Sequence, residues 1–567
     1  MKKPSIIFLL AIIFLALFFR FYALGQNDLL GDDGHYAFRA LGWLDYLASN
    51  TQTAPIQWFG HIPWWANLSF HDHPPVMFLL QHVSFKFLGP TALAARLPVA
   101  LFSLMAVIVF FYLMKKSKGE WPAIFAAGLL AISTHAVWVS RLSLNDGLVL
   151  SFEIVALFFL YQFIGQAQGR NLYGWAIFVG LALLSKYTAA FLLPAGLIYL
   201  IVWRREVFKK KEIWLVGIML LIVLSPIIIY NFQIYITRGH FDACLSHMVG
   251  MRPNDFSLIK DRVVNFNLVN NFVAEIKSLY GACSFLFFLL KLTGLIYLLV
   301  KLGRKKADDF EKLVVITILS IMAMFLFMGP ASRYFSIIDP WLIAAVVIFV
   351  FDFWSWIIHQ KSFWLSGFSI VLFSLIVLSE LLYSINTNLL VKPLGRPVRD
   401  YLADRSYNYG FNQLDLFIRE KIYQPLPTLV RTTEFNRIPL SRLEVENHDF
   451  VVYDNTISWF GEIGYLSKYQ IYYRLPVVSY SGFVQTFPNA KDALKFLEQV
   501  GAKRLWYIFA ANPETQDVNL KQDHLRVGSM ASLAENFEKA GIKPFIINDA
   551  AGQIAFKVYY LDVKNGQ

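Results

Sequence analysis

The chain has 567 residues, of which 57% are hydrophobic and only 16% are charged. Soluble globular proteins carry about 25% charged residues. The composition therefore excludes a cytosolic enzyme, a disordered tail and a fibrous protein, and it indicates an integral membrane protein. Two cysteines, Cys244 and Cys283, exclude a disulfide scaffold and a cysteine-rich metal site.

The net charge of +12 is unevenly distributed along the chain. Residues 1–385 hold 30 Lys and Arg against 20 Asp and Glu, whereas residues 386–567 hold 21 against 19. The basic excess therefore lies between the hydrophobic segments, where membrane orientation explains it. The charge indicates no nucleic acid as a partner.

Runs of about 20 apolar residues, the length that crosses a bilayer, divide residues 1–385. The first run, Ser5–Leu24, is interpreted as a retained span and not as a signal peptide, because it is long and no small-residue cleavage site follows it. Ten further spans are predicted at Leu93–Met114, Pro122–Val139, Gly147–Ile164, Tyr173–Ser185, Thr188–Trp203, Ile213–Tyr230, Ser278–Val300, Leu313–Met328, Phe335–Ile358 and Phe363–Ile385.

Eleven spans place the two ends of the chain on opposite sides of the membrane. The turns predicted to be cytoplasmic are rich in Lys and Arg, whereas the predicted outer loops are longer and contain few, as the positive-inside rule requires. These basic residues are Lys115, Lys116, Lys118, Arg204, Arg205, Lys209, Lys210, Lys211, Lys301, Arg304, Lys305 and Lys306. We therefore predict a multi-pass protein of the cell membrane with a cytoplasmic N-terminus.

The remaining segments divide into a first outer loop and a C-terminal domain. Within the loop, residues 25–92, the apolar run Pro75–Leu88 is too short to span and is predicted as an interfacial helix. Residues 386–567 alternate strand-like and helix-like runs, which favours a small extracytoplasmic α/β domain. The strand-like runs are Phe450–Tyr453, Arg504–Phe509, Pro544–Ile547 and Ile554–Leu561, and the helix-like runs are Ala490–Val500 and Ser532–Ala540.

Two aspartates, Asp32 and Asp33, follow the first span, in residues 31–37 (GDDGHYA). Apolar residues recur behind them at helical spacing, as in an amphipathic helix lying on the membrane surface. The aspartates would then occupy its N-terminus at the level of the lipid headgroups. Helix capping explains one acid there, and a functional role is the alternative for the pair.

The first outer loop closes with His71, Asp72 and His73, followed by two prolines that start the interfacial helix. Contiguous side chains rarely all point at one ion, so a polar turn at the interface is favoured over a metal site. If a divalent metal does bind, Asp72 and His71 are the predicted ligands. No cofactor is predicted with certainty.

Further charges stand at predicted outer turns. Arg141 and Asp146 belong to one hairpin, Lys186 lies between two short spans, and Arg333 precedes Tyr334. Each has a structural alternative, either pairing across a turn or reaching toward headgroups, but charge at a membrane boundary is a functional hypothesis by default.

All of these residues fall on one side of the bilayer. Glu153, Asp352 and Glu380 are predicted as buried acids elsewhere, but they form no ladder through the membrane, as a transporter would need. Carboxylates can accept the proton of an attacking hydroxyl, and cations can stabilise a departing phosphate. Sugar transfer from a lipid-linked phosphosugar needs both.

The pattern resembles the polytopic GT-C glycosyltransferases, specifically the superfamily of protein O-mannosyltransferases and lipid A aminoarabinose transferases. Those enzymes carry an Asp-Glu-x-x-Tyr-Ala-like motif, a His-Pro-Pro or Lys-Pro-Pro motif, an Ala-x-Arg-Leu-Pro motif, a second acidic turn, a Thr-Lys-Gly turn and an Arg-Tyr pair. The matching segments here are, in order, residues 32–37 (DDGHYA), 73–75 (HPP), 93–98 (LAARLP), 140–146 (SRLSLND), 185–186 (SK) and 333–334 (RY).

The resemblance implies a GT-C fold over residues 1–385 and inverting transfer of a sugar from dolichyl or undecaprenyl phosphate, outside the cytoplasm. It makes Asp32 the base, with Asp33 and Asp146 as further catalytic acids. Asp33 stands where the family usually has Glu, so a contact made there can differ. The histidine before Pro-Pro stands where the aminoarabinose enzymes have lysine, which weakens a lipid A assignment.

The resemblance further implies donor-phosphate contacts from Arg141, Lys186, Arg333, Tyr334 and His73. Some members of the superfamily hold a metal near the His-Pro-Pro turn, where Asp72 would be the matching acid.

The sequence leaves three hypotheses. The first is a hexosyl or pentosyl transferase whose partners are a polyprenyl-phosphate sugar, membrane lipids and a protein, lipid or glycan acceptor. The second is a polytopic lipid or sugar transporter or flippase, and the third is a membrane anchor for the outer domain. The one-sided cluster of polar residues favours the first.

Overall fold

The computed structural model describes residues 3–46, 53–166, 168–256, 267–329, 332–391, 394, 408–433, 438, 440–516 and 524–563. Its contacts divide the chain into two compact units. Unit 1 contains Met1–Leu24, Ser49–Leu80 and Arg96–Ala403, and unit 2 contains Gly25–Ala48, Gln81–Ala95 and Asp404–Gln567. Two segments of the first loop therefore group with the C-terminal residues.

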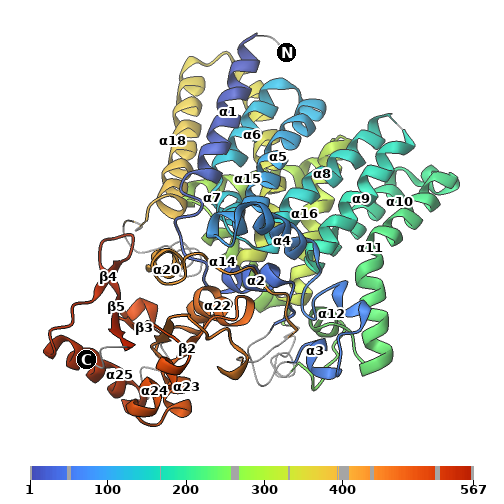
Figure 1. The fold of residues 1–567 in the computed structure, drawn as a ribbon. Coiled ribbons are helices and arrows are strands. Elements are labelled where there is room, and N and C mark those ends of the chain that lie inside the picture. The colour runs from blue at the N-terminus through green and yellow to red at the C-terminus, as the bar shows by residue number, and fades with distance from the viewer. Residues whose placement is uncertain are drawn as a thin grey trace. The chain divides into compact units, whose positions relative to one another are not determined.

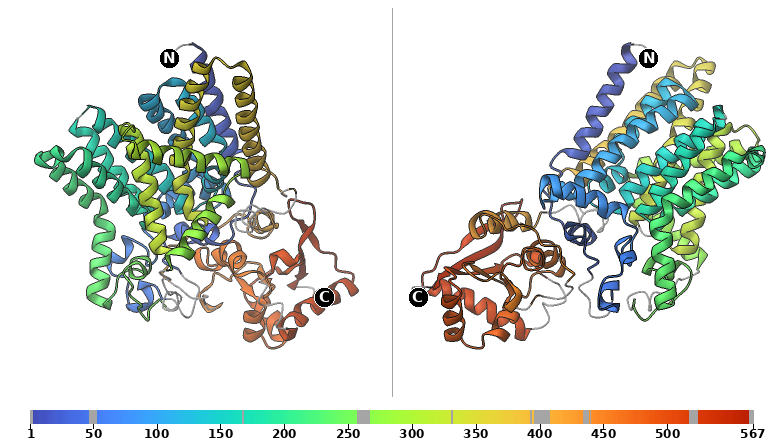
Figure 2. Two further views of the ribbon diagram at one scale, coloured as in Figure 1. Left: turned by 180° about the vertical axis from the view of Figure 1, so that it is seen from behind. Right: turned by 45° about the vertical axis from the view of Figure 1, so that its right-hand side comes forward.

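Unit 1 is a bundle of helices built from the apolar runs (Figures 1 and 2). Its core is one continuous hydrophobic cluster that extends over most of the helices. The long elements are α1 (Lys3–Phe21), α5 (Ala92–Lys118), α6 (Glu120–Ile132), α7 (Thr134–Ser140), α8 (Asn145–Gln166), α9 (Gly169–Ser185), α10 (Leu192–Trp203), α11 (Lys211–Arg238), α14 (Leu268–Gly281), α15 (Phe285–Gly303), α16 (Asp309–Met328), α17 (Asp339–Gln360) and α18 (Phe363–Asn388).

Short elements connect these helices. They are α3 (Pro55–Trp58), η1 (Trp64–Asn67), α4 (Val76–Leu88), η2 (Tyr187–Phe191), η3 (Arg205–Lys209), α12 (Ala243–Met248) and η4 (Ser332–Ile338). Of these, α4 is divided, because its residues from Gln81 onward group with unit 2. Helix α4 covers the run that was predicted as an interfacial helix.

Seven helices among the described residues are long and apolar enough to cross a membrane, or eight if α6 and α7 form one bent span. This agrees with a multi-pass membrane protein, whereas the count of eleven stays a prediction. The first predicted span and the one at Thr188–Trp203 correspond to shorter apolar helices, Ile6–Phe21 and Tyr187–Trp203. The expected span Ser278–Val300 is wrong in its limits, because α14 ends at Gly281 and α15 begins at Phe285.

The predicted span Pro122–Val139 is also interrupted. Helices α6 and α7 meet at Ser133 with a bend of 59°. The carboxylate of Glu380 accepts hydrogen bonds from the backbone N–H and the hydroxyl of Thr134, both at 2.8 Å. The break thus exposes backbone polar groups that a buried acid of α18 satisfies, as low-dielectric surroundings require.

Unit 2 contains a mixed five-stranded sheet of order β2-β1-β3-β5-β4 (Figure 1). The strands are β1 (Phe450–Tyr453), β2 (Val477–Ser479), β3 (Arg504–Ala510), β4 (Phe545–Asn548) and β5 (Ile554–Asp562). Strand β1 pairs in parallel with β2 and β3, and β5 pairs antiparallel with β3 and β4. The predicted α/β domain is confirmed, and β2 is the strand that the sequence analysis missed because it has only three residues.

The helices of unit 2 come before the first strand or between the strands along the chain. They are α2 (Asp32–Gly42), α20 (Phe411–Phe417), η5 (Ile418–Ile422), η6 (Leu440–Arg442), α21 (Trp459–Gly461), η7 (Glu462–Ser467), α22 (Lys468–Tyr472), α23 (Tyr480–Thr486), α24 (Ala490–Gln499), η8 (Pro513–Thr515) and α25 (His524–Lys539). Helices α24 and α25 correspond to the two helix-like runs of the sequence.

Candidate active site

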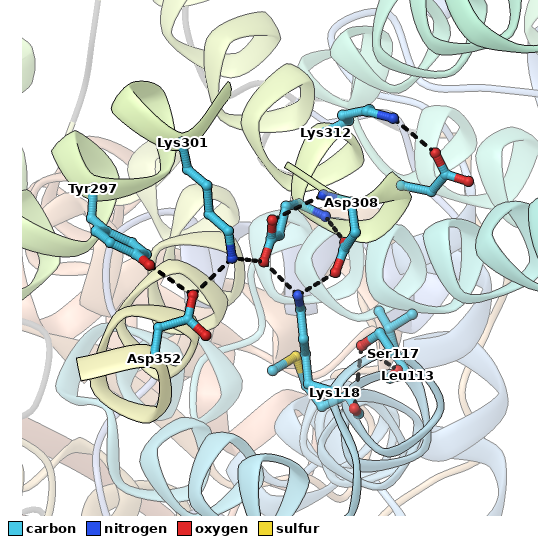
Figure 3. A network of polar contacts seen from close by, with 11 residues as sticks. Leu113, Ser117, Lys118, Tyr297, Lys301, Asp308, Lys312 and Asp352 are labelled. Atoms are coloured by element: carbon cyan, nitrogen blue, oxygen red, sulfur yellow. Dashed lines mark hydrogen bonds and ion pairs between the residues drawn. The ribbon is translucent and has the colours of Figure 1, made fainter. Parts of the chain in front are cut away.

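The basic residues of the predicted cytoplasmic turns meet at one end of unit 1. Lys118 and Lys301 both donate to the buried carboxylate of Glu311, near the start of α16 (Figure 3). Arg204 pairs with Asp309 in the same first turn of α16, at 2.5 Å. Three turns far apart in sequence therefore lie at the same end of the bundle, as their predicted common sidedness requires.

The candidate site residues of unit 1 lie at the opposite ends of the same helices. Helix α8 begins with Asn145 and Asp146, and its other end carries Gln162, which accepts a hydrogen bond from Lys116 of the basic end. Asp146 and Gln162 are separated by about 24 Å of helix, at 1.5 Å per residue. Helix α16 likewise runs from the basic end toward η4, which carries Arg333.

A buried ion pair joins the second acidic turn to the lysine turn. The Nζ of Lys186 donates to both carboxylate oxygens of Asp146, at 2.7 and 2.9 Å. Asp146 is 2% exposed and Lys186 is 8% exposed. The sequence places Lys186 at the break between α9 and η2, where its extended backbone ends one helix and precedes the next.

Tyr334 connects this ion pair to the third predicted cation. Its ring centroid lies 3.8 Å from the Nζ of Lys186 and 5.1 Å from the Cζ of Arg333. Nη2 of Arg333 also donates to the Tyr334 hydroxyl at 3.3 Å. The structure thus brings Asp146, Lys186, Arg333 and Tyr334 together, and their summed formal charge of +1 suits an anionic ligand.

Arg141 takes a different place from the one predicted. Its guanidinium donates to the backbone carbonyl of Phe19 at 2.9 Å, near the end of α1. Burial, reinforced by the positive charge of Arg96, lowers the pKa of Arg141 to about 10. Arg141 therefore anchors α1, and its described contacts do not include Asp146, the partner across the hairpin that the sequence suggested.

The His-Asp-His turn is a compact polar structure within unit 1. Nδ1 of His73 lies 3.1 Å from Oδ2 of Asp72, and Nδ1 of His71 lies 4.0 Å from Oδ1. This geometry fits a turn in which Asp72 orients two imidazoles, the interpretation that the sequence favoured. His71 and Asp72 offer the nitrogen and oxygen donors that a divalent ion accepts, and metal binding there stays a prediction.

The buried acid Asp242 and the two residues that follow it connect the His-Asp-His turn to the turn that contains Lys186. The hydroxyl of Tyr187, the residue after Lys186, donates to Asp242 at 2.5 Å. Ala243 N–H donates to the carbonyl of His71 at 2.7 Å, and the thiol of Cys244 donates to the carbonyl of Asp72 at 2.8 Å. Asp242 has no counterpart in the sequence motifs, because a lone acid in a long loop gives no signal.

Asp32 and Asp33 belong to unit 2, where they form the first turn of α2. Gly31 precedes them with φ of 62°, a conformation that favours glycine, and allows the chain to turn sharply into the helix. Asp33 is 1% exposed, whereas Asp32 is half-buried. The first of the two acids is therefore the one that solvent reaches.

An apolar groove of about 510 Å³ lies in unit 1 between η2, α10 and α16. Ala190, the lining residue that comes first in the sequence, is four positions after Lys186. Leu319 and Phe327 on its other wall are 45% and 57% exposed, so the groove opens on the outside of the bundle. It is lined by Ala190, Phe191, Pro194, Ile198, Met248, Ile316, Leu319, Ser320, Ala323, Met324 and Phe327.

Comparisons with known proteins find similarity to mannosyltransferases. Residues 72–230 match the family described as dolichyl-phosphate-mannose-protein mannosyltransferase. The putative mannosyltransferase YkcB of Bacillus subtilis is 29% identical over 147 residues, which are 26% of this chain and 20% of YkcB. These matches make a segment of the chain similar to mannosyltransferases, in line with the resemblance to GT-C glycosyltransferases that the motifs indicated.

Solved structures agree with this assignment at the level of the fold. ArnT from Cupriavidus metallidurans bound to undecaprenyl phosphate has a TM-score of 0.52 and 14% identity, with 97% of both chains covered. The apo oligosaccharyltransferase of Archaeoglobus fulgidus has a TM-score of 0.50 and 14% identity, over 92% of this chain and 71% of that one. The GT-C fold predicted from the motifs is therefore confirmed.

Three polar residues of unit 1 escaped the sequence analysis as individual site candidates. Asn145, Thr188 and Ser336 are 1%, 6% and 0% exposed, and their side chains find no hydrogen-bond partner within the described contacts. They stand on α8, η2 and η4, which carry or adjoin the residues of the Lys186 group. Buried polar groups are normally paired, so these three are candidates for contacts with a ligand.

Of the three acids expected to be buried elsewhere in unit 1, two are buried and one is not. Asp352 has a side chain 42% exposed and pairs with Lys301 at 2.7 Å in the network at the basic end (Figure 3). Its prediction as a buried acid was wrong, because a helix-length pattern does not tell which face meets a neighbour. Glu153 and Glu380 are fully buried.

Proposed function

We propose that this protein transfers a sugar from a polyprenyl-phosphate donor to a hydroxyl group of an extracytoplasmic acceptor, with inversion at the sugar carbon. The observation that carries the proposal is the buried ion pair of Asp146 and Lys186, together with the half-buried Tyr334 and Arg333, at the end of the bundle opposite its basic turns. The segment aligned with YkcB is 20% of the length of YkcB. We therefore propose the activity and the substrates of this chain from its own residues.

In this mechanism, the donor phosphate binds the cations of unit 1. Lys186 and Arg333 compensate the charge that develops on the phosphate as the bond between it and the sugar carbon breaks. Asp146 holds the Lys186 ammonium in place through two hydrogen bonds. The hydroxyl and amide groups of Asn145, Thr188 and Ser336 supply neutral contacts to the donor.

The prenyl chain occupies the apolar groove of unit 1. A polyprenyl chain is wholly apolar, and the groove begins one helical turn beyond Lys186, so a phosphate at Lys186 leaves its chain next to the groove. ArnT, which is similar in fold, is bound to undecaprenyl phosphate, and this supports a polyprenyl phosphate as the ligand.

The base is Asp32 of unit 2. As the acceptor oxygen forms its bond to the sugar carbon from the face opposite the phosphate, Asp32 takes the hydroxyl proton and the polyprenyl phosphate departs as an anion. A phosphate leaves without protonation, so one base and a cationic cradle suffice. His73 adds a contact to the donor phosphate, and Asp72 and His71 are the residues that would hold a divalent ion.

The test is transfer by purified protein in lipid nanodiscs, with polyprenyl-phosphate mannose, glucose, galactose and aminoarabinose as donors. Asp32→Asn should reduce transfer to a small residual rate and retain donor binding, because the amide cannot accept the proton. Asp549→Asn, in a β-turn of the C-terminal domain, is the matched control and should transfer at the wild-type rate. Full activity in Asp32→Asn would contradict the assigned base.

A further inference from the structure

The C-terminal domain holds the segment that leads into the proposed base. Asp28, four residues before Asp32, is 1% exposed. Its carboxylate accepts hydrogen bonds from the backbone N–H groups of Tyr409 at 2.6 Å, Phe411 at 3.3 Å and Asn412 at 2.8 Å. These groups surround the start of α20, so a carboxylate from the first loop caps a helix of the C-terminal domain.

Asn412 makes the reciprocal contacts. Its side-chain amide donates to three consecutive backbone carbonyls, those of Gly25 at 3.3 Å, Gln26 at 3.0 Å and Asn27 at 2.9 Å. Its side-chain oxygen accepts from the hydroxyl of Tyr465 at 2.9 Å. That hydroxyl in turn accepts from the N–H of Leu29 at 2.6 Å.

Helix α2 itself also rests on the domain. The hydroxyl of Tyr472 donates to the carbonyl of Phe38 at 2.8 Å, and the two rings lie 4.8 Å apart. The ring of His35 lies 5.8 Å from that of Trp459 in α21. Every residue from Gly25 to Leu29 therefore has a described hydrogen bond to the C-terminal domain, and α2 contacts that domain through His35 and Phe38.

We propose that the C-terminal domain positions the catalytic base, with Asp28 and Asn412 as the positioning residues that fix the segment before Asp32. The inference rests on the proposed function, since it assigns a role to the domain in the same transfer reaction. Only Leu30 and Gly31 lie between the anchored segment and Asp32, so a shift of Asp28 moves the base directly. A misplacement of about 1 Å at a reacting group costs about 100-fold in rate.

The experiment uses the full-length protein and the variant Asp28→Asn, which keeps the side-chain volume but turns an amide toward N–H donors. Asp549→Asn is the matched control, because Asp549 also accepts two backbone N–H groups in the same domain, from Ala551 and Gln553 at 2.8 Å. We expect kcat to fall about 100-fold in Asp28→Asn, with unchanged binding of undecaprenyl phosphate and unchanged kcat in the control.

A double-mutant cycle separates positioning from general loss of stability. In the Asp32→Asn background the base is already lost, so Asp28→Asn should lower the residual rate by less than about 3-fold if it acts through Asp32. A full 100-fold loss in that background, or an unchanged kcat in the single variant, would overturn the inference. Tyr465→Phe gives a milder test if Asp28→Asn folds poorly, because it removes only the hydroxyl between Leu29 N–H and Asn412. It should lower kcat in the otherwise wild-type protein and have little effect in the Asp32→Asn background.

Amide exchange distinguishes failure of this inference from failure of the proposed function. Exchange over residues 32–42 should accelerate in Asp28→Asn and not in Asp549→Asn, whatever the protein transfers. Unchanged exchange in α2 contradicts the positioning role even if transfer is observed. Accelerated exchange in a protein that transfers no sugar would retain the anchoring of α2 and reject its link to catalysis.

Discussion

Lys186 can have two roles in its buried pair with Asp146: it can bind the donor phosphate, or it can only neutralise the carboxylate. Substitutions of the two residues distinguish these roles. In Lys186→Met, the carboxylate of Asp146 loses the ammonium that donates to both of its oxygens at 2.7 and 2.9 Å. Removing one member of a buried ion pair costs about 3–5 kcal/mol, because the other charge stays buried without compensation. We therefore expect a clear drop in the thermal unfolding temperature.

The same variant should bind the donor phosphate weakly. A charge-assisted hydrogen bond contributes about 1.5–3 kcal/mol, so affinity for undecaprenyl phosphate should fall about 10- to 100-fold. Isothermal titration in nanodiscs measures this loss. Lys209→Met is the matched control, because Lys209 is an exposed lysine at the basic end, 78% accessible and paired with Glu206; it should bind the lipid as the wild type does.

The double variant Lys186→Met with Asp146→Asn decides between the two roles. Without the carboxylate, no buried charge is left alone, and most of the lost stability should return. Phosphate affinity should stay low, because the cation is still absent. Recovery of both stability and affinity would refute the reasoning, since Lys186 would then serve only to neutralise Asp146.

Three further predictions concern other parts of the structure. Gly42→Ala should lower the unfolding temperature by overpacking, at about 1–3 kcal/mol, because its Cβ would stand 2.0 Å from the ring of Tyr472, whereas Gly60→Ala meets no atom within 4 Å and should not. Burial raises the pKa of Glu275 to about 7 from 4.5, so the folded protein holds this proton more tightly than the unfolded chain. The free energy of unfolding should therefore be highest below pH 4.5 and decline as the pH rises to 7, and thermal melts of Glu275→Gln across this range should show a smaller decline. Glu311→Gln should cost about 1–3 kcal/mol in unfolding free energy, since it removes charge-assisted bonds from two lysines; an unchanged melt would contradict the network of Figure 3.

Much of the candidate site follows from short motifs, because membrane topology constrains where they can lie. Two turns at the same side of a bilayer share a narrow layer, so Asp146, Lys186 and Arg333 could be expected near one another before any coordinates were known. Their contacts confirm that expectation for these three residues together with Tyr334. Arg141 shares the same layer, yet it turns to the backbone of α1, because layer position does not determine side-chain direction.

The sequence by itself indicated the membrane class, the resemblance to GT-C glycosyltransferases and the α/β character of the C-terminal residues. The membrane class and the α/β character depend on composition and on periodicity within a segment, and such local patterns are visible without knowledge of neighbours. The GT-C resemblance depends on short motifs and their order along the chain. The tertiary structure alone decided that residues 25–48 fold with the C-terminal domain and that Asp28 caps α20. Those contacts join residues more than 380 positions apart, and hydrogen bonds between backbone and side chain at such separation leave no periodic trace in the chain.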